Sequence, residues 1–196
     1  MFEDCPLVHL KTEYPWETTN AVDMGSMFCN CIFLESIEIK CNLNTENVKF
    51  MNYMFKNCKK IKLFPNMNLW KTTKLQYSNS MFEGCSHITS IPDISNWNTS
   101  NLQNCSMMFK DCKSLNNIPD FGKWNFLNVD CMDGMFINCL SLFLLPNIKF
   151  NEAKQIEPRN LFNGCINLSH FPRNFYEAYE EIIIKSNIDD CINLSK

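Results

Sequence analysis

The sequence predicts an α/β repeat protein, a leucine-rich-repeat-like solenoid of about seven modules with short parallel strands on its concave face and short helices or turns on its convex face. Three observations support this prediction. One short string recurs at a nearly constant period through all 196 residues. The spacing of apolar residues changes within each copy from a helical to an extended pattern. Each copy then closes with Pro, Asp and Asn, which favour turns.

The recurring string is Met-Phe, two variable residues and Cys. Its copies read MFEDC at Met1, MFCNC at Met27, MFKNC at Met54, MFEGC at Met81, MFKDC at Met108, MFINC at Met135 and LFNGC at Leu161. The period of this string therefore divides the chain into modules that start near 1, 27, 54, 81, 108, 135 and 161. A partial last module and a C-terminal cap, residues 174–196, follow, and we interpret 1–196 as a single domain.

The first part of each module has the periodicity of a short helix. In one copy, apolar residues are spaced three and four apart, as on one helix face: Leu102, Cys105, Met108, Phe109 and Cys112. Thr99 or Ser100 precedes this run, where a side-chain oxygen caps the first free amides of a helix. The pattern predicts either a short helix of two to three turns or a single helical turn, which begins at that cap.

The second part of each module is extended and brief. Leu115 and Ile118 lie three apart, and a proline follows in this and four other copies, at Pro65, Pro92, Pro119, Pro146 and Pro172. Because proline donates no backbone hydrogen bond, the strands should be very short. An Asn or Asp comes next, at Asn66, Asp93, Asp120 and Asn147. This row could hold a cation, but side chains that close turns explain it equally well, and we favour the turns.

One extended and one helical segment in each period is typical of leucine-rich repeats. The repeated text also resembles the BspA-like leucine-rich repeat proteins over essentially all of 1–196. One module matches their motif at Met81, Phe82, Cys85, Ile88, Ile91, Ile94, Trp97 and Thr99. The resemblance implies a binding or surface-recognition role with no catalytic residues.

Composition excludes several classes of function. A net charge of −3 and a pI near 5.6 give no electrostatic basis for binding nucleic acid. No apolar run is long enough to cross a bilayer, and no secretory signal is visible at the start of the chain. The sequence thus predicts a cytoplasmic protein, or one held within an assembled particle.

The twelve cysteines indicate a scaffold rather than a metal or disulfide framework. Eight follow the repeat: Cys5, Cys31, Cys58, Cys85, Cys112, Cys139, Cys165 and Cys191. Zinc sites need two pairs of closely spaced ligands, and only Cys29 and Cys31 come close to forming one such pair. If helices separate the coils on the cysteine side by about 10 Å, adjacent thiols lie too far apart for disulfides. We therefore expect reduced, buried and unligated cysteines, with no metal and no cofactor.

Stacking explains why residues repeat, so recognition should depend on residues that differ between modules and face solvent. In the extended segments these are Lys62, Leu63, Thr89, Ser90, Asn116, Asn117, Phe143 and Leu144. Phe143 and Leu144 form the most conspicuous pair, either as an exposed partner anchor or as core beneath a terminal module. No nucleophile, base and orienting group come together in the repeat register, so we do not expect an enzyme.

The prediction for function is a non-enzymatic scaffold that binds a protein partner through its concave face or through the ends of the solenoid. Two alternatives stay open. The chain could be a structural component of a larger particle, such as a virion or other assembly, whose neighbours cover the ends. It could instead be an exported surface adhesin. The sequence does not identify the partner.

Overall fold

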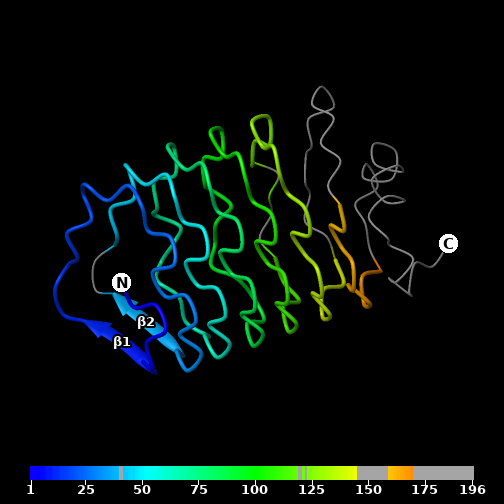
Figure 1. The fold of residues 1–196 in the computed structure, drawn as a ribbon, viewed down its shortest axis with the longest axis horizontal. Helices are drawn as coiled ribbons and strands as arrows, with labels where there is room; N and C mark the ends of the chain where they lie inside the picture. The colour runs from blue at the N-terminus through cyan, green and yellow to red at the C-terminus, as the bar shows by residue number, and fades with distance from the viewer. Residues whose placement is uncertain (40–41, 119–120, 122, 145–158, 170–196) are drawn as a thin grey trace.

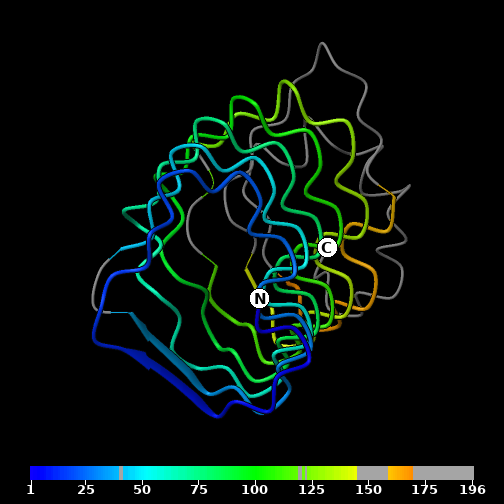
Figure 2. The same ribbon diagram turned by 60° about the vertical axis from the view of Figure 1, so that its left-hand side comes forward.

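The computed structural model describes residues 1–39, 42–118, 121, 123–144 and 159–169. The described chain winds in successive coils that lie side by side along the long axis of the molecule (Figure 1). In the turned view, the coils surround a shared interior (Figure 2). The buried apolar side chains of the repeats form one core cluster. Each coil takes one repeat of the sequence.

Neighbouring coils pair in parallel and in the register of the repeat. Strand β1 (His9–Thr12) pairs with β2 (Ser36–Ile39), and His9 lies opposite Ser36. Six isolated bridges continue the pairing: Asp23 with Phe50, Ser36 with Leu63, Phe50 with Tyr77, Tyr77 with Asn104, Ser90 with Asn117, and Asn104 with Cys131. The two partners of every bridge occupy the same position in successive repeats, so equivalent positions stack on one another.

Proline explains where the strands stop. β1 and β2 have Lys11 and Glu38 at the position that later coils fill with Pro65 and Pro92. In those later coils the ladder shrinks to single bridges at Leu63 and Ser90. The expectation of very short strands is confirmed for these coils, because each proline withdraws one backbone donor from the ladder.

The segment expected to form a short helix or turns forms consecutive turns, and the described residues contain no helix. Every second amide in this segment donates to the next coil, for example Phe28 N–H to the Met54 carbonyl at 2.8 Å and Asn30 N–H to the Lys56 carbonyl at 2.7 Å. The amide between them closes a local turn, since Cys29 N–H donates to the Ser26 carbonyl. Amides used between coils cannot form the bonds within a helix.

The same bonds correct the expected spacing on the cysteine side. Phe55 N–H donates to the Met81 carbonyl at 2.9 Å, and Phe109 N–H donates to the Met135 carbonyl at 2.9 Å. Coils joined in this way lie at the separation of paired strands, about 4.8 Å. The prediction of about 10 Å was wrong because it assumed helices between the coils.

The residue before each cysteine of the repeat adopts a left-handed backbone conformation. Its φ is 57° at Asp4, 60° at Asn30, 59° at Asn57, 74° at Gly84, 60° at Asp111, 57° at Asn138 and 77° at Gly164. Gly, Asn and Asp are the residues that adopt this conformation most readily. The position is therefore filled by one of these three types in every one of these copies.

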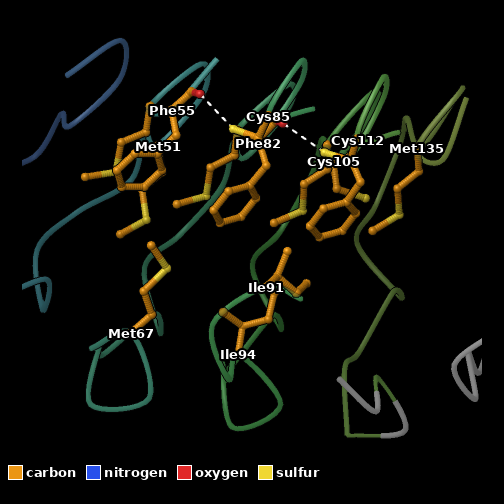
Figure 3. Packing of buried hydrophobic residues seen from close by; sticks show 14 of the residues in the cluster. Met51, Phe55, Met67, Phe82, Cys85, Ile91, Ile94, Cys105, Cys112 and Met135 are labelled. Carbon is orange, nitrogen blue, oxygen red and sulfur yellow. Dashed lines mark hydrogen bonds between the residues drawn. The ribbon is translucent and has the colours of Figure 1, made fainter. Parts of the chain in front are cut away.

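Stacked aromatic rings occupy the centre of the core. The phenylalanine of each string packs against its equivalent one coil away, with ring centroids 5.4 Å apart for Phe28 and Phe55, 5.7 Å for Phe55 and Phe82, and 5.6 Å for Phe82 and Phe109. These rings are fully buried, beside methionine, isoleucine and cysteine side chains (Figure 3). A second stack runs through Trp70, Trp97 and Trp124, at 6.0 and 6.1 Å.

Threonine links coils instead of capping a helix. Thr99 is buried, and its Oγ1 donates to the carbonyl of Asn125 at 3.1 Å and accepts from the Asn125 amide at 2.7 Å. Thr45 and Thr72 make the same donation to Lys71 and Asn98. The expected role of Thr99 as a helix cap is therefore wrong, because no helix follows it.

The expected C-terminal cap, residues 174–196, lies outside the described residues, as do Cys41, Cys191, Asp120 and Asn147. Within the described ranges, no helix reaches the length and apolarity needed to cross a bilayer.

Candidate interaction surface

The eight residues predicted to contact a partner all have exposed side chains, and we call them the exposed row: Lys62, Leu63, Thr89, Ser90, Asn116, Asn117, Phe143 and Leu144. Backbone bonds place the members of the row on neighbouring coils. The amides of Asn116 and Asn117 both donate to the Thr89 carbonyl, at 3.1 and 3.2 Å. In the last coil that the structure describes, the Ser169 amide donates to the Phe143 carbonyl at 3.2 Å.

A local irregularity lets two successive side chains face solvent in each coil. The amides of Lys62 and Leu63 both donate to the carbonyl of Glu35, at 2.9 and 3.2 Å, instead of to alternate acceptors. Ile61 just before this pair is fully buried, and Phe64 just after it packs against the core. The buried neighbours fix the backbone, so the exposed pair is presented from a rigid support.

The chemistry of the row changes along the stack. Lys62 pairs with Glu35 at 3.5 Å, and both side chains are substantially exposed, so this ion pair stabilises the fold little. Hydroxyl and amide groups occupy the next two coils. Phe143 and Leu144 end the row with exposed fractions of 50% and 52%. The alternative that this pair belongs to the core is wrong, because half of each side chain meets solvent.

The row of Asn and Asp after the prolines forms turns where it is described. The Asn66 carboxamide oxygen accepts the Asn68 amide at 3.2 Å, and an Asp93 carboxylate oxygen accepts the Ser95 amide at 3.0 Å and the Ser95 hydroxyl at 2.7 Å. The two bonds from Ser95 hold the pKa of Asp93 below its usual value. The described residues include no group of three or more His, Cys, Asp or Glu placed to hold a metal ion.

One polar cluster has the residue types of a catalytic site but not the connectivity. His9 Nδ1 lies 3.0 Å from Ser36 Oγ, and Ser36 Oγ donates to Glu38 at 3.5 Å. In a nucleophilic triad the histidine lies between the carboxylate and the serine. Here it is the serine, not the histidine, that contacts the carboxylate, so the order of contacts differs from that of a triad. The three side chains form a polar contact between strands β1 and β2.

The cysteines of the repeat form a ladder of thiol hydrogen bonds that the sequence did not reveal. Each thiol donates to the carbonyl of the phenylalanine one coil earlier, as Cys85 does to Phe55 and Cys112 to Phe82, both at 3.1 Å (Figure 3). Cys31, Cys58, Cys139 and Cys165 do the same. The predicted burial is confirmed for these six and wrong for Cys5, which is half-buried in the first coil.

Burial makes these thiols hard to ionise. Desolvation is the main cause that raises the pKa of Cys58, Cys85, Cys112 and Cys139, and each neighbouring thiol raises it further. Cys105, out of the repeat register, is also buried as expected, and burial raises its pKa to about 12. Because the thiolate is the nucleophile and the metal ligand, thiols held in this protonated state are chemically inert.

A buried carboxylate joins three coils, which sequence reasoning also missed. Glu83 pairs with Lys56 at 3.0 Å and with Lys110 at 3.6 Å, and these lysines occupy the same repeat position in the coils before and after it. Desolvation alone would raise the pKa of Glu83, but hydrogen bonds from Lys56 and Ser80 and the charges of both lysines outweigh it and lower the pKa. The alternation of Lys, Glu and Lys at one repeat position was the sequence signal.

Comparison with known proteins places the chain in one family. No curated protein and no solved structure matches it. The model of a family described as Mycoplasma protein of unknown function, DUF285, matches twice, over residues 1–91 and 65–175. The two overlapping matches agree with a repeat that continues through the chain. This protein belongs to the DUF285 family.

Proposed function

We propose that this chain is a non-enzymatic scaffold that binds a protein partner through the exposed row, and that its repeats are leucine-rich repeats of the BspA-like kind. One observation carries the proposal. All eight side chains chosen from the repeat register are exposed, and backbone bonds hold their segments on a stack of coils. The parallel pairing of equivalent positions in successive repeats supports the assignment of the repeat type.

The composition of the exposed row favours a protein as the ligand. Apolar side chains at Leu63, Phe143 and Leu144 can bury area against a partner, while the hydroxyl and amide groups between them can pair with its polar groups. Large apolar side chains such as Phe143 supply much of the binding energy when a partner excludes water from them. The core beneath the row keeps these groups in place before binding, which lowers the entropic cost.

The thiol ladder supports a reducing environment for the scaffold. The ten described cysteines are free, and those of the ladder use their hydrogens in bonds between coils. Oxidation would remove these bonds. We therefore propose the cytoplasm, or the inside of an assembled particle, as the location of the protein.

The test is quantitative affinity capture from cells of the source organism. The double variant Phe143→Asp/Leu144→Asp removes the apolar end of the row, whereas Leu127→Asp changes a residue with 50% exposure elsewhere. We expect the double variant to lose at least one protein that wild type and Leu127→Asp both retain, by a factor of about ten for each 1.4 kcal/mol of binding energy. Equal recovery of every protein by all three, with unchanged melting temperatures, would rule out the apolar end as an anchor.

A further inference from the structure

A second position of the repeat, the residue before each copy of the Met-Phe string, also adopts the left-handed backbone conformation. Its φ is 52° at Ser26, 60° at Tyr53, 55° at Ser80, 54° at Met107, 61° at Gly134 and 54° at Asn160. Glycine and asparagine adopt this conformation readily, and serine is small. Tyr53 and Met107 are the exceptions, because a bulky side chain is strained at a positive φ.

Burial in the core does not offset the strain at these two residues. The exposed fraction is 36% for Tyr53 and 38% for Met107. A bulky residue held in this conformation with its side chain in solvent lowers stability without filling the core. Strained residues of this kind cluster at binding sites, where the side chain itself is needed. The outliers therefore indicate that Tyr53 and Met107 take part in recognition.

Backbone bonds place the two side chains in one row. The Tyr53 amide donates to the Asn79 carbonyl at 3.0 Å, and the Ser80 amide donates to the Ser106 carbonyl at 2.8 Å. Tyr53, Ser80 and Met107 thus occupy one position in three successive coils, each about 4.8 Å from the next. Ser80 is buried. In this row, Tyr53 and Met107 therefore project on either side of a short side chain.

The charges beside this row are unequally exposed. Lys56 and Lys110 follow Tyr53 and Met107 by three residues and share the carboxylate of Glu83. The lysine side chains are 30% and 29% exposed, whereas that of Glu83 is only 11% exposed. Lys56 Nζ also lies 5.3 Å from the centre of the Tyr53 ring. Two ammonium groups with one carboxylate leave one positive charge, and the lysines face solvent more than the carboxylate does.

The carboxylate next in sequence to Lys110 is bonded to the following coil. Asp111 accepts the side-chain amide of Asn138 at 2.8 Å. A ligand that fits this surface therefore needs two features. It carries a carboxylate for the ammonium groups, and beside it an apolar side chain for the exposed Tyr53 and Met107.

We infer that Tyr53, Lys56, Met107 and Lys110 form a second binding surface, which takes an acidic segment of a protein partner. A carboxylate of the segment pairs with the lysines, and an apolar side chain beside it packs against Tyr53 and Met107. Charge complementarity favours a protein segment, because nucleic acids and anionic membranes are bound by longer runs of positive charge than two lysines. None of the four residues belongs to the exposed row, so the inference does not rest on the proposed function.

Selection of short random peptides displayed on phage, with the full chain immobilised, tests the inference. We expect a group of enriched peptides that carry Asp or Glu beside an apolar residue. Fluorescence anisotropy then measures the affinity of these peptides for wild type and for Tyr53→Asn/Met107→Asn. The variant should bind them at least about tenfold more weakly. Its melting temperature should not fall, because asparagine suits the left-handed conformation better than tyrosine or methionine does.

Two further variants separate the apolar and charged contributions. Leu127→Asn, at a residue with 50% exposure elsewhere on the chain, is the matched control and should leave the affinity unchanged. Lys110→Gln removes one ammonium group and should weaken binding of the same peptides and reduce its salt dependence, with the melting temperature as a check on the fold.

Three results would overturn the inference. In the first, no enriched peptide distinguishes wild type from Tyr53→Asn/Met107→Asn. In the second, the peptides that do so lack acidic residues or bind Lys110→Gln as tightly as wild type. In the third, double-stranded DNA or vesicles of phosphatidylglycerol bind through Tyr53 and Met107 more tightly than the peptides, which would identify a surface for polyanions instead.

Discussion

At the scale of single residues, the backbone conformation before each cysteine explains why only three residue types occur at that position. The position is filled by Asp, Asn or Gly, and it holds a positive φ in all seven copies. Two copies use glycine for a second reason: a Cβ at Gly84 would meet Asn57 Oδ1, and one at Gly164 would meet Asn138 Oδ1. The side chain in one coil thus restricts the residue in the next.

Gly84→Ala should therefore destabilise the protein by about 1–2 kcal/mol from the left-handed conformation alone, and further through the contact with Asn57. Chemical denaturation of wild type and variant measures the loss. The double variant Asn57→Gly/Gly84→Ala separates the two causes, since it removes the contact but keeps the backbone conformation. If Gly84→Ala costs the same with and without the Asn57 side chain, the contact does not contribute.

The buried thiols give a prediction for alkaline pH. Burial raises the pKa of these groups in the folded state, whereas in the unfolded chain they ionise near the ordinary thiol pKa of 9.0. The unfolded state therefore releases more protons above that pH, and stability falls as pH rises. Each thiol that ionises only on unfolding contributes a slope of about 1.4 kcal/mol per pH unit.

Denaturant melts between pH 8 and pH 11 check this expectation, with the Cys85→Ala/Cys112→Ala variant as control. The variant should start less stable but lose stability less steeply, because two of the ionising groups are gone. Parallel pH profiles for both proteins would show that these thiols ionise equally in the folded and unfolded states.

At the scale of elements, each repeated position forms a ladder across the stack, and each ladder has its own chemistry. Phenylalanine rings stack, threonine hydroxyls bridge backbones, cysteine thiols donate to carbonyls, and one carboxylate joins two lysines. In addition, backbone amides in the Met-Phe segments donate hydrogen bonds to carbonyls of the next coil. Hydrogen bonds between coils thus take the place of bonds within helices.

The charged ladder is the one that a single substitution can test. Glu83→Gln keeps the shape of the side chain but removes the charge that Lys56 and Lys110 share. We expect a loss of about 1–2 kcal/mol at neutral pH, between the values for exposed and for fully buried pairs. Thermal or denaturant unfolding measures it, and Lys71→Gln, which breaks the exposed pair with Glu46, serves as control.

The pH dependence of that loss has a defined sign. The pKa of Glu83 is lowered on folding, so its contribution is complete above the unfolded value of 4.5 and disappears as pH falls through the lower folded value. The difference between wild type and Glu83→Gln should therefore shrink in acid. A difference that stays constant down to pH 2 would mean that the charge is not the cause.

At the scale of the whole molecule, stability should depend on the number of coils, because each coil contacts mainly its neighbours. Deletion of residues 109–135 removes one period and joins Met108 directly to Phe136, which restores the Met-Phe string. The shortened protein should fold, with a lower melting temperature. Circular dichroism and thermal unfolding check this, and deletion of residues 109–121, which breaks the register, should prevent folding. Equal behaviour of the two deletions would contradict stacking by register.

The repeat could be predicted from the sequence because the same residues return at a fixed period. The stacking of equivalent positions explains this recurrence. The burial of Phe109 and Cys112 and the exposure of Asn116 follow from the register alone. The register left Phe143 either exposed or buried, and the structure decided that it is exposed. The turns at Asn66 and Asp93 were also predictable, since a short polar side chain after proline closes a turn through its own backbone.

Tertiary structure alone decided how the backbone hydrogen bonds are used. Apolar residues spaced three and four apart fit both a helix and a series of turns. Likewise, Thr99 could either cap a helix or form a hydrogen bond to Asn125 in the next coil. The choice depends on whether each amide bonds within its coil or to the next coil, which is a contact between residues one repeat apart, as for Phe109 and Met135. The local sequence pattern holds no information about such bonds. The sequence therefore determined which residues stack, and the tertiary structure determined how closely neighbouring coils approach each other.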